Sequence, residues 1–99
     1  MKYVLPEDLA SLRSGFPGVV MREIVAEVSA ATGVPVETIM SRDCTIYAVR
    51  PRDVAIWIAQ RQGLSHMAIA RAMGRDHTSI GSALHRERKR RAEMLTPPE

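Results

Sequence analysis

The chain has 99 residues, of which 45% are hydrophobic and only 4% aromatic, and its formal net charge is +3. This length suffices for one compact domain and excludes two, and so few aromatic side chains favour packed helices over a sandwich of strands. A single cysteine, Cys44, excludes an internal disulfide, and the sequence shows neither a membrane-spanning run nor a signal peptide, so we expect a cytoplasmic protein.

The N-terminal part is predicted to contain a short helix and a first main helix. The short helix is expected over residues 6–13, because a proline and two acidic residues suit a first helical turn, and residues 16–18 are predicted to form a turn. From Val19 onward, apolar residues recur at helical spacing as far as Gly33, which is placed where a left-handed C-terminal cap belongs.

A short helical turn, a loop and a central helix come next. Residues 36–40 are predicted to form the turn, with Ile39 and Met40 pointing inward, and residues 41–49 have no helical period and are predicted to form a loop. The next helix is expected over residues 50–63, with a proline in its first turn. Since its middle part is apolar nearly all round, it should be the most buried helix.

The last two helices are predicted to form a pair joined by a tight turn. Ser65 is expected to cap the first of them, which ends at Gly74 and buries an apolar face made of Met67, Ile69, Ala70 and Met73. The second helix is expected from His77 to about Met94. Two helices joined in this way form a helix-turn-helix. The predicted fold is therefore all-α, a compact bundle of about five to six helices with a C-terminal helix-turn-helix.

Positive charge is concentrated in the C-terminal part of the chain. Residues 1–40 carry a net charge of −2 and the remaining residues carry +5. A one-sided basic field attracts a phosphate backbone, although a charged helix can also be a solvated face that serves solubility.

The last helix has two different faces when its residues are placed about 100° apart. The core face is formed by Ile80, Ala83 and Leu84 and continues into Glu87 and Arg91. The opposite face carries small hydrogen-bonding residues near its start and larger basic ones beyond them, namely Thr78, Ser82, His85 and Lys89. This order suits a helix whose first turns enter a major groove, because short side chains admit base edges while longer cations reach phosphates.

Two residues near the start of the last helix allow two interpretations each. Asp76 can cap the helix by accepting the amide of Ser79 or of a neighbour, or it can contact a base, and both roles are compatible. Gly81 lowers helix stability relative to alanine. Either a side chain at this position would hold the helix away from DNA, or the helix packs tightly against a neighbour there.

Metal and catalytic sites are not expected. His77 and His85 are eight residues apart, so they lie about 80° apart on the helix and cannot share a metal ion, and His66 belongs to another helix. The sequence contains no glycine-rich phosphate loop, nucleophile elbow or obvious pair of carboxylates. We therefore expect a binding module that needs no cofactor, and not an enzyme.

The segment VRPRDVAIWIAQRQGLSHMAIARAMGRDHTSIGSALHR resembles the C-terminal DNA-binding domain of the bacterial replication initiator DnaA, a Trp-repressor-like helix-turn-helix. The resemblance extends from about Val19 to Arg91 and is sharpest at residues 50–52 and 74–79. It implies that residues 76–79 face bases and backbone in the major groove and that Arg52 contacts DNA. Together with the helical faces, it gives the expected DNA-binding residues Arg50, Arg52, Ser65, Arg75, Asp76, His77, Thr78, Ser79, Ser82, His85, Arg86 and Lys89.

The sequence departs from the family in the loop before the central helix and at several single positions. Members usually carry a basic loop with an arginine that enters the minor groove; here Cys44 is placed about where that arginine would be, so this contact is expected to be absent. Asp53 replaces a usual glutamine, a second glycine before Arg75 is missing, and Ser82 aligns with a usual histidine. We therefore expect binding to duplex DNA, but not to the box sequence of the initiator. Without an ATPase domain the chain cannot by itself be an initiator.

The expected function is sequence-specific binding of double-stranded DNA in the nucleoid, by a transcriptional regulator of a prophage-like kind or by the DNA-binding part of a longer regulator. The alternative is an accessory module of replication or transcription that kept the fold but not specific recognition. RNA polymerase, other regulatory proteins and a second copy of the chain are the protein partners considered. The expected organisation is an extension over residues 1–18, the DnaA-like domain over 19–94 and a tail or linker over 95–99.

Overall fold

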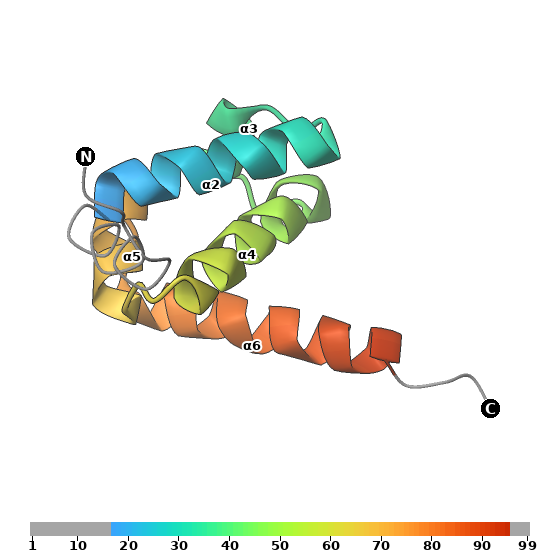
Figure 1. Cartoon of the computed structure of the whole chain (residues 1–99). Helices are drawn as coiled ribbons and strands as arrows, with labels where there is room; N and C mark the ends of the chain where they lie inside the picture. Colours follow the sequence, from blue (N-terminus) through green and yellow to red (C-terminus); the bar gives the residue numbers. More distant parts are fainter. Residues whose placement is uncertain (1–16, 96–99) are drawn as a thin grey trace, which may run out of the picture.

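The computed structural model describes residues 17–95, and every regular element within this range is a helix (Figure 1). This confirms the all-α fold. The predicted helix over residues 6–13 lies outside the described residues. The helices are α2 (Pro17–Thr32), α3 (Val36–Met40), α4 (Ile46–Arg61), α5 (His66–Met73) and α6 (His77–Leu95).

Helix α4 is the centre of the bundle, as predicted. It packs against α2, α3, α5 and α6, and Figure 1 shows it between α2 and α6. Isoleucines from all five described helices are almost fully buried in the shared core, and α2 also contributes valines and a methionine. The isoleucines are Ile24, Ile39, Ile56, Ile69 and Ile80, each at most 2% exposed. Because α6 is fixed through Ile80 to this core, the orientation of its outer face is defined.

Two methionines that were expected to point inward are exposed. Met40 is 37% exposed and Met67 is 53% exposed. The helix α3 has only five residues and buries a single side chain, that of Ile39. Met67 lies two residues before Ile69, which places it about 200° around α5 on the side away from the core.

Helix α4 begins at Ile46, four residues before the predicted start, so the loop is shorter than expected. The carbonyl of Thr45 accepts the amides of Ala48 and Val49 at 3.1 and 2.9 Å, and Asp43 accepts the amide of Thr45 at 2.8 Å. The extra turn buries Ala48 completely. Pro51 therefore lies inside the helix, and the prediction that proline marks the helix start was wrong. Helix α2 likewise begins at Pro17, so residues 17 and 18 are helical where a turn was predicted, and residue 16 lies outside the described residues.

The ends of α5 follow the predicted capping pattern. Ser65 accepts the amide of Ala68 at 3.1 Å with its hydroxyl, and Gly74 adopts a left-handed conformation with a φ of 65°. The amide of Arg75 then donates to the carbonyl of Ala70 at 2.9 Å. This cap turns the chain sharply and sets the direction in which α6 leaves. Among residues 17–95, no helix has the length and apolar character required to cross a bilayer.

Candidate nucleic-acid interface

Helix α6 presents one buried face and one open face. Ile80, Ala83, Leu84 and Glu87 are buried. The side chains of the predicted outer face are all exposed, namely Thr78, Ser82, His85 and Lys89. The two faces of this helix are therefore confirmed. The hydroxyls lie in its first two turns and the basic side chains lie farther along.

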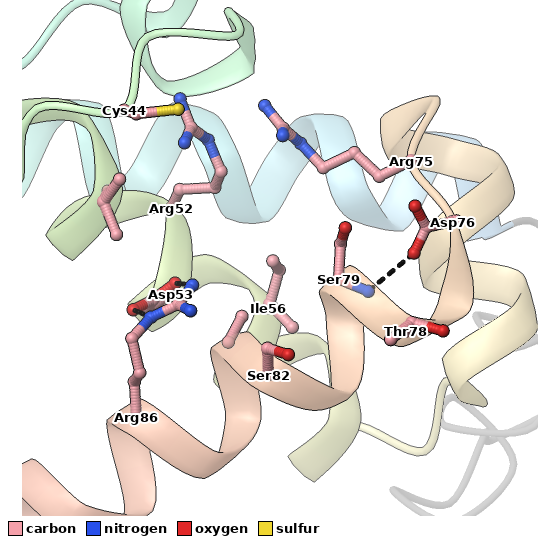
Figure 2. A pocket seen from close by; sticks show the side chains of 12 residues that line it. Cys44, Arg52, Asp53, Ile56, Arg75, Asp76, Thr78, Ser79, Ser82 and Arg86 are labelled. Carbon is pink, nitrogen blue, oxygen red and sulfur yellow. Dashed lines mark hydrogen bonds and ion pairs between the residues drawn. The ribbon is translucent and has the colours of Figure 1, made fainter.

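The start of α6 is capped by Asp76. Its Oδ1 accepts the amide of Ser79 at 2.7 Å, as Figure 2 shows. The hydrogen bond from the Ser79 amide lowers the pKa of the Asp76 carboxyl, so the cap is held in its charged form. Asp76 itself is exposed, as are His77, Thr78 and Ser79, which follow it. The predicted capping role is confirmed, and the cap leaves this turn open to solvent.

A groove lies between the first half of α6, the turn before it and the first half of α4 (Figure 2). The structure brings seven of the predicted site residues together along it: Arg52, Arg75, Asp76, Thr78, Ser79, Ser82 and Arg86. Cys44 also lines the groove, from the loop between α3 and α4. The loop and the first half of α6 therefore face the same space.

Arg52 is not placed as expected. Its side chain is buried, and its guanidinium donates to three backbone carbonyls at the end of α3. Nε lies 2.8 Å from the Ile39 oxygen, and Nη2 lies 2.8 Å from the Ser41 oxygen. Burial lowers the pKa of Arg52. Since Nε and Nη2 both donate to these carbonyls, Arg52 positions the loop that follows α3 and is not extended into solvent.

Arg75 has a similar role in the turn before α6. Its Nη2 also donates to the carbonyl of Ser41, and its Nε is buried without a partner among the described residues. The side chain is partly buried. Two arginines, one from α4 and one from the turn before α6, thus converge on one carbonyl. The end of α3 is thereby joined both to α4, through Arg52, and to the turn that precedes α6, through Arg75.

Arg50 and Ser65 are not brought to the groove. Arg50 is exposed, but it lines a different groove together with Ile46 and Tyr47. Arg50 lies two positions before Arg52, which places the two side chains about 200° apart around α4. Ser65 caps α5 and lines a hollow with Met67. The expectation that these two residues join the set on α6 is therefore not met.

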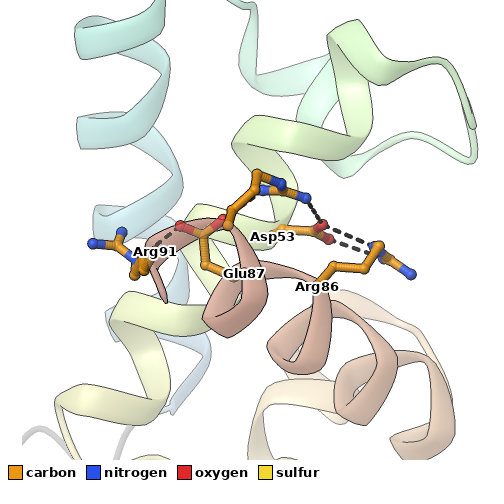
Figure 3. A network of polar contacts seen from close by, with 5 residues as sticks. Asp53, Arg86, Glu87 and Arg91 are labelled. Carbon is orange, nitrogen blue, oxygen red and sulfur yellow. Dashed lines mark hydrogen bonds and ion pairs between the residues drawn. The ribbon is translucent and has the colours of Figure 1, made fainter. Parts of the chain in front are cut away.

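A charged network between α4 and α6 was missed in the sequence (Figure 3). The buried carboxylate of Asp53 binds Arg86 at 2.9 and 3.0 Å and Arg90 at 2.7 Å. Glu87, also buried, forms ion pairs with Arg90 and Arg91. Two signals could have indicated the network: an aspartate begins an otherwise apolar helix segment, and a glutamate is placed on the core face of α6.

Known protein families were compared with the chain. The model of the bacterial dnaA protein helix-turn-helix matches residues 21–86, which is two thirds of the chain. Comparisons with curated proteins and with solved structures gave no match. The matched segment includes α4, α5 and the first half of α6, which carries most of the open face. The family consists of DNA-binding domains and not of catalytic ones. The chain therefore belongs to the bacterial dnaA protein helix-turn-helix family.

Proposed function

We propose that this protein binds double-stranded DNA sequence-specifically, as a transcriptional regulator in the cytoplasm or as the DNA-binding part of a longer regulator. In this proposal residues 19–94 form the DNA-binding domain, and the first half of α6 reads the major groove. The observation that carries it is the open face of α6, where Thr78 and Ser82 are exposed while Ile80 and Leu84 are buried.

The shape of this face supports close approach to DNA. The hydroxyls of Thr78 and Ser82 are short and can both donate and accept hydrogen bonds at base edges. Gly81 lies on the flank of the same face, and a Cβ added there would meet no atom of the protein within 4 Å. Tight packing against a neighbour therefore does not explain this glycine. We attribute it to the approach of the helix backbone to DNA.

The phosphate contacts are assigned to the later part of the same face. His85 and Lys89 are exposed, and Lys89 has no hydrogen-bond or ion-pair partner within the described part of the chain. His77, at the first position of α6, is exposed beside the cap. In this proposal short side chains read bases and longer ones reach the flanking phosphates, which fixes the register of the protein on the duplex.

Selection from a pool of random duplexes tests this function. We expect enrichment of a defined sequence, and Thr78→Ala should lower the affinity for it more than for unrelated DNA. Lys89→Gln should weaken binding to all duplexes alike and reduce the salt slope by about 1. Thr32→Ala, which makes the same change at an exposed position at the end of α2, is the matched control. A pool without enrichment, together with unchanged binding by Thr78→Ala, would count against specific recognition.

A second candidate function is an accessory module that docks onto a protein of replication or transcription. It is favoured by the groove beside Arg50, where Ile46 is 71% exposed, Tyr47 is 56% exposed and Met94 is 84% exposed. RNA polymerase, another regulator or a second copy of the chain are the candidate partners. For the second copy, sedimentation should depend on protein concentration and lose this dependence in Tyr47→Asp. A monomer at all concentrations would exclude the homodimer.

A further inference from the structure

The carboxylate of Asp53 binds two arginines of the recognition helix. Asp53 is fully buried and accepts Nε and Nη2 of Arg86 in a two-pronged contact. It also accepts Nη2 of Arg90 at 2.7 Å. The hydrogen bond with Asp53 raises the pKa of Arg86. Such two-pronged contacts between charged groups are among the strongest hydrogen bonds in proteins.

The location of Arg86 makes this contact relevant to DNA. Arg86 lines the same groove as Thr78 and Ser82, and its side chain is 48% exposed. A phosphate at the groove could therefore reach it, but its guanidinium is turned back to Asp53 (Figure 2). Arg90 is turned in the same way and is 24% exposed.

Arg91 and Lys89, two further cations of α6, differ from each other in whether they have a partner within the protein. Arg91 lies over the ring of Trp57, with its guanidinium carbon 3.6 Å from the ring centre, and forms an ion pair with Glu87. Lys89, by contrast, extends from the open face without a partner in the part of the chain that the structure describes. A count of basic residues therefore overstates the charge that α6 offers to a phosphate backbone.

We propose that Asp53 is a specificity-determining residue, because it withholds the charges of Arg86 and Arg90 from DNA phosphates. Phosphate contacts supply nearly all of the affinity for unrelated DNA, whereas base contacts distinguish one sequence from another. Because the two arginines are paired inside the protein, the phosphate contribution to affinity is lower and the base contacts are unaffected. This inference rests on the proposed function. It adds Asp53, a residue of α4 that need not touch DNA, to the residues that determine specificity.

A comparison of two cations on α6 tests the inference without a substitution at Asp53 itself. Arg86→Gln and Lys89→Gln each remove one positive charge, and their affinities are measured for an unrelated duplex over a salt series. Lys89→Gln should reduce the salt slope by about 0.9. Arg86→Gln should leave the slope at the wild-type value. A reduction by Arg86→Gln as large as that by Lys89→Gln would overturn the inference.

Substitution of Asp53 itself distinguishes the inference from a purely structural role. The inference predicts that the affinity for unrelated DNA rises, whereas loss of a purely structural residue would lower it. Asp53→Asn should free one or both arginines, so the affinity for unrelated DNA at low salt should rise several-fold and the salt slope should steepen by about 0.9 for each freed arginine. The double variant Asp53→Asn/Arg86→Gln should reverse part of this gain. Glu93→Gln, which removes one negative charge from an exposed position on α6, is the matched control. Weaker binding of folded Asp53→Asn to every duplex would overturn the inference.

Further measurements distinguish a folding defect of Asp53→Asn from failure of the inference, and failure of the inference from failure of the proposed function. Circular dichroism establishes whether Asp53→Asn folds, and if it does not, the comparison of Arg86→Gln with Lys89→Gln decides alone. Failure of the random-duplex selection to enrich a sequence would refute the proposed function. A salt slope reduced equally by Arg86→Gln and by Lys89→Gln would refute the inference about Asp53 and leave the proposed function standing.

Discussion

Arg52 donates from Nε to the backbone carbonyl of Ile39 at a distance of 2.8 Å, with a side chain that is only 6% exposed. An arginine in the motif that most clearly indicates the family is thus part of the interior. It ties the first half of α4 to the end of α3, and Arg75 reaches the same segment from the turn before α6. The two arginines therefore help to build the wall of the groove.

Replacing Arg52 should therefore lower the free energy of unfolding. Arg52→Ala removes three charge-assisted hydrogen bonds and leaves carbonyls of Thr38, Ile39 and Ser41 without this donor. We expect a loss of about 2–3 kcal/mol, measured by urea denaturation. Arg50→Ala is the matched control, because Arg50 is exposed and two residues away on the same helix, and it should change stability by less than about 0.5 kcal/mol. Equal effects of the two substitutions would contradict the positioning role of Arg52.

Loss of the cap at α6 should lower thermal stability in a pH-dependent way. Asp76→Ala removes the acceptor for the Ser79 amide, and we expect the melting temperature to fall by a few degrees. The pKa of Asp76 is lower in the folded chain than the ordinary value, so its contribution is present above about pH 4 and is lost as the carboxyl is protonated at lower pH.

Thermal melts of Asp76→Ala and the wild type at neutral pH and near pH 3 measure this dependence. The difference between the two proteins should shrink at the lower pH. Glu37→Ala, at an exposed position in α3, serves as a control for removal of a surface carboxylate. A difference of the same size at both pH values would show that the charged cap is not its source.

Gly81→Ala should raise stability and lower DNA affinity together. A Cβ at this position meets nothing within 4 Å, so alanine should gain about 0.5–1 kcal/mol of helix stability in the free protein. The same methyl group should weaken binding if the backbone of α6 lies against DNA. Gly33→Ala provides the contrast, because Gly33 has a φ of 77° and alanine there should be destabilising. Stabilisation at Gly81 without any loss of DNA affinity would contradict the close approach.

Much of the fold could be predicted because it depends on local patterns. Helix periodicity and capping residues were sufficient for the ends of α5, the start of α6 and the two faces of α6. The start of α4 was missed because Pro51 marks a first turn in most helices, whereas here burial of Ala48 adds a turn before it. Met40 and Met67 were assigned to the core by residue type alone, and side-chain type does not specify which part of a short helix faces inward.

The candidate site was less predictable, because its charges are paired over long sequence distances. The contact of Asp53 with Arg86 spans 33 residues and its contact with Arg90 spans 37. A wheel of α6 identifies exposed positions, but it cannot show which exposed cations bend back to another helix. From the sequence, Arg86 is therefore expected to contact DNA together with Lys89, and only the packing of α6 against α4 distinguishes the two.

Insertion of α6 into the major groove is tested most directly by removing groove atoms from the DNA. In the selected duplex, 7-deazapurines lack the N7 acceptor of the major groove, and inosine in place of guanosine lacks the amino group of the minor groove. We predict that 7-deaza substitution at contacted positions lowers the affinity, that inosine leaves it unchanged, and that Thr78→Ala or Ser82→Ala reduces the sensitivity to 7-deaza substitution. Sensitivity to inosine with none to 7-deaza substitution would contradict recognition by this face of α6.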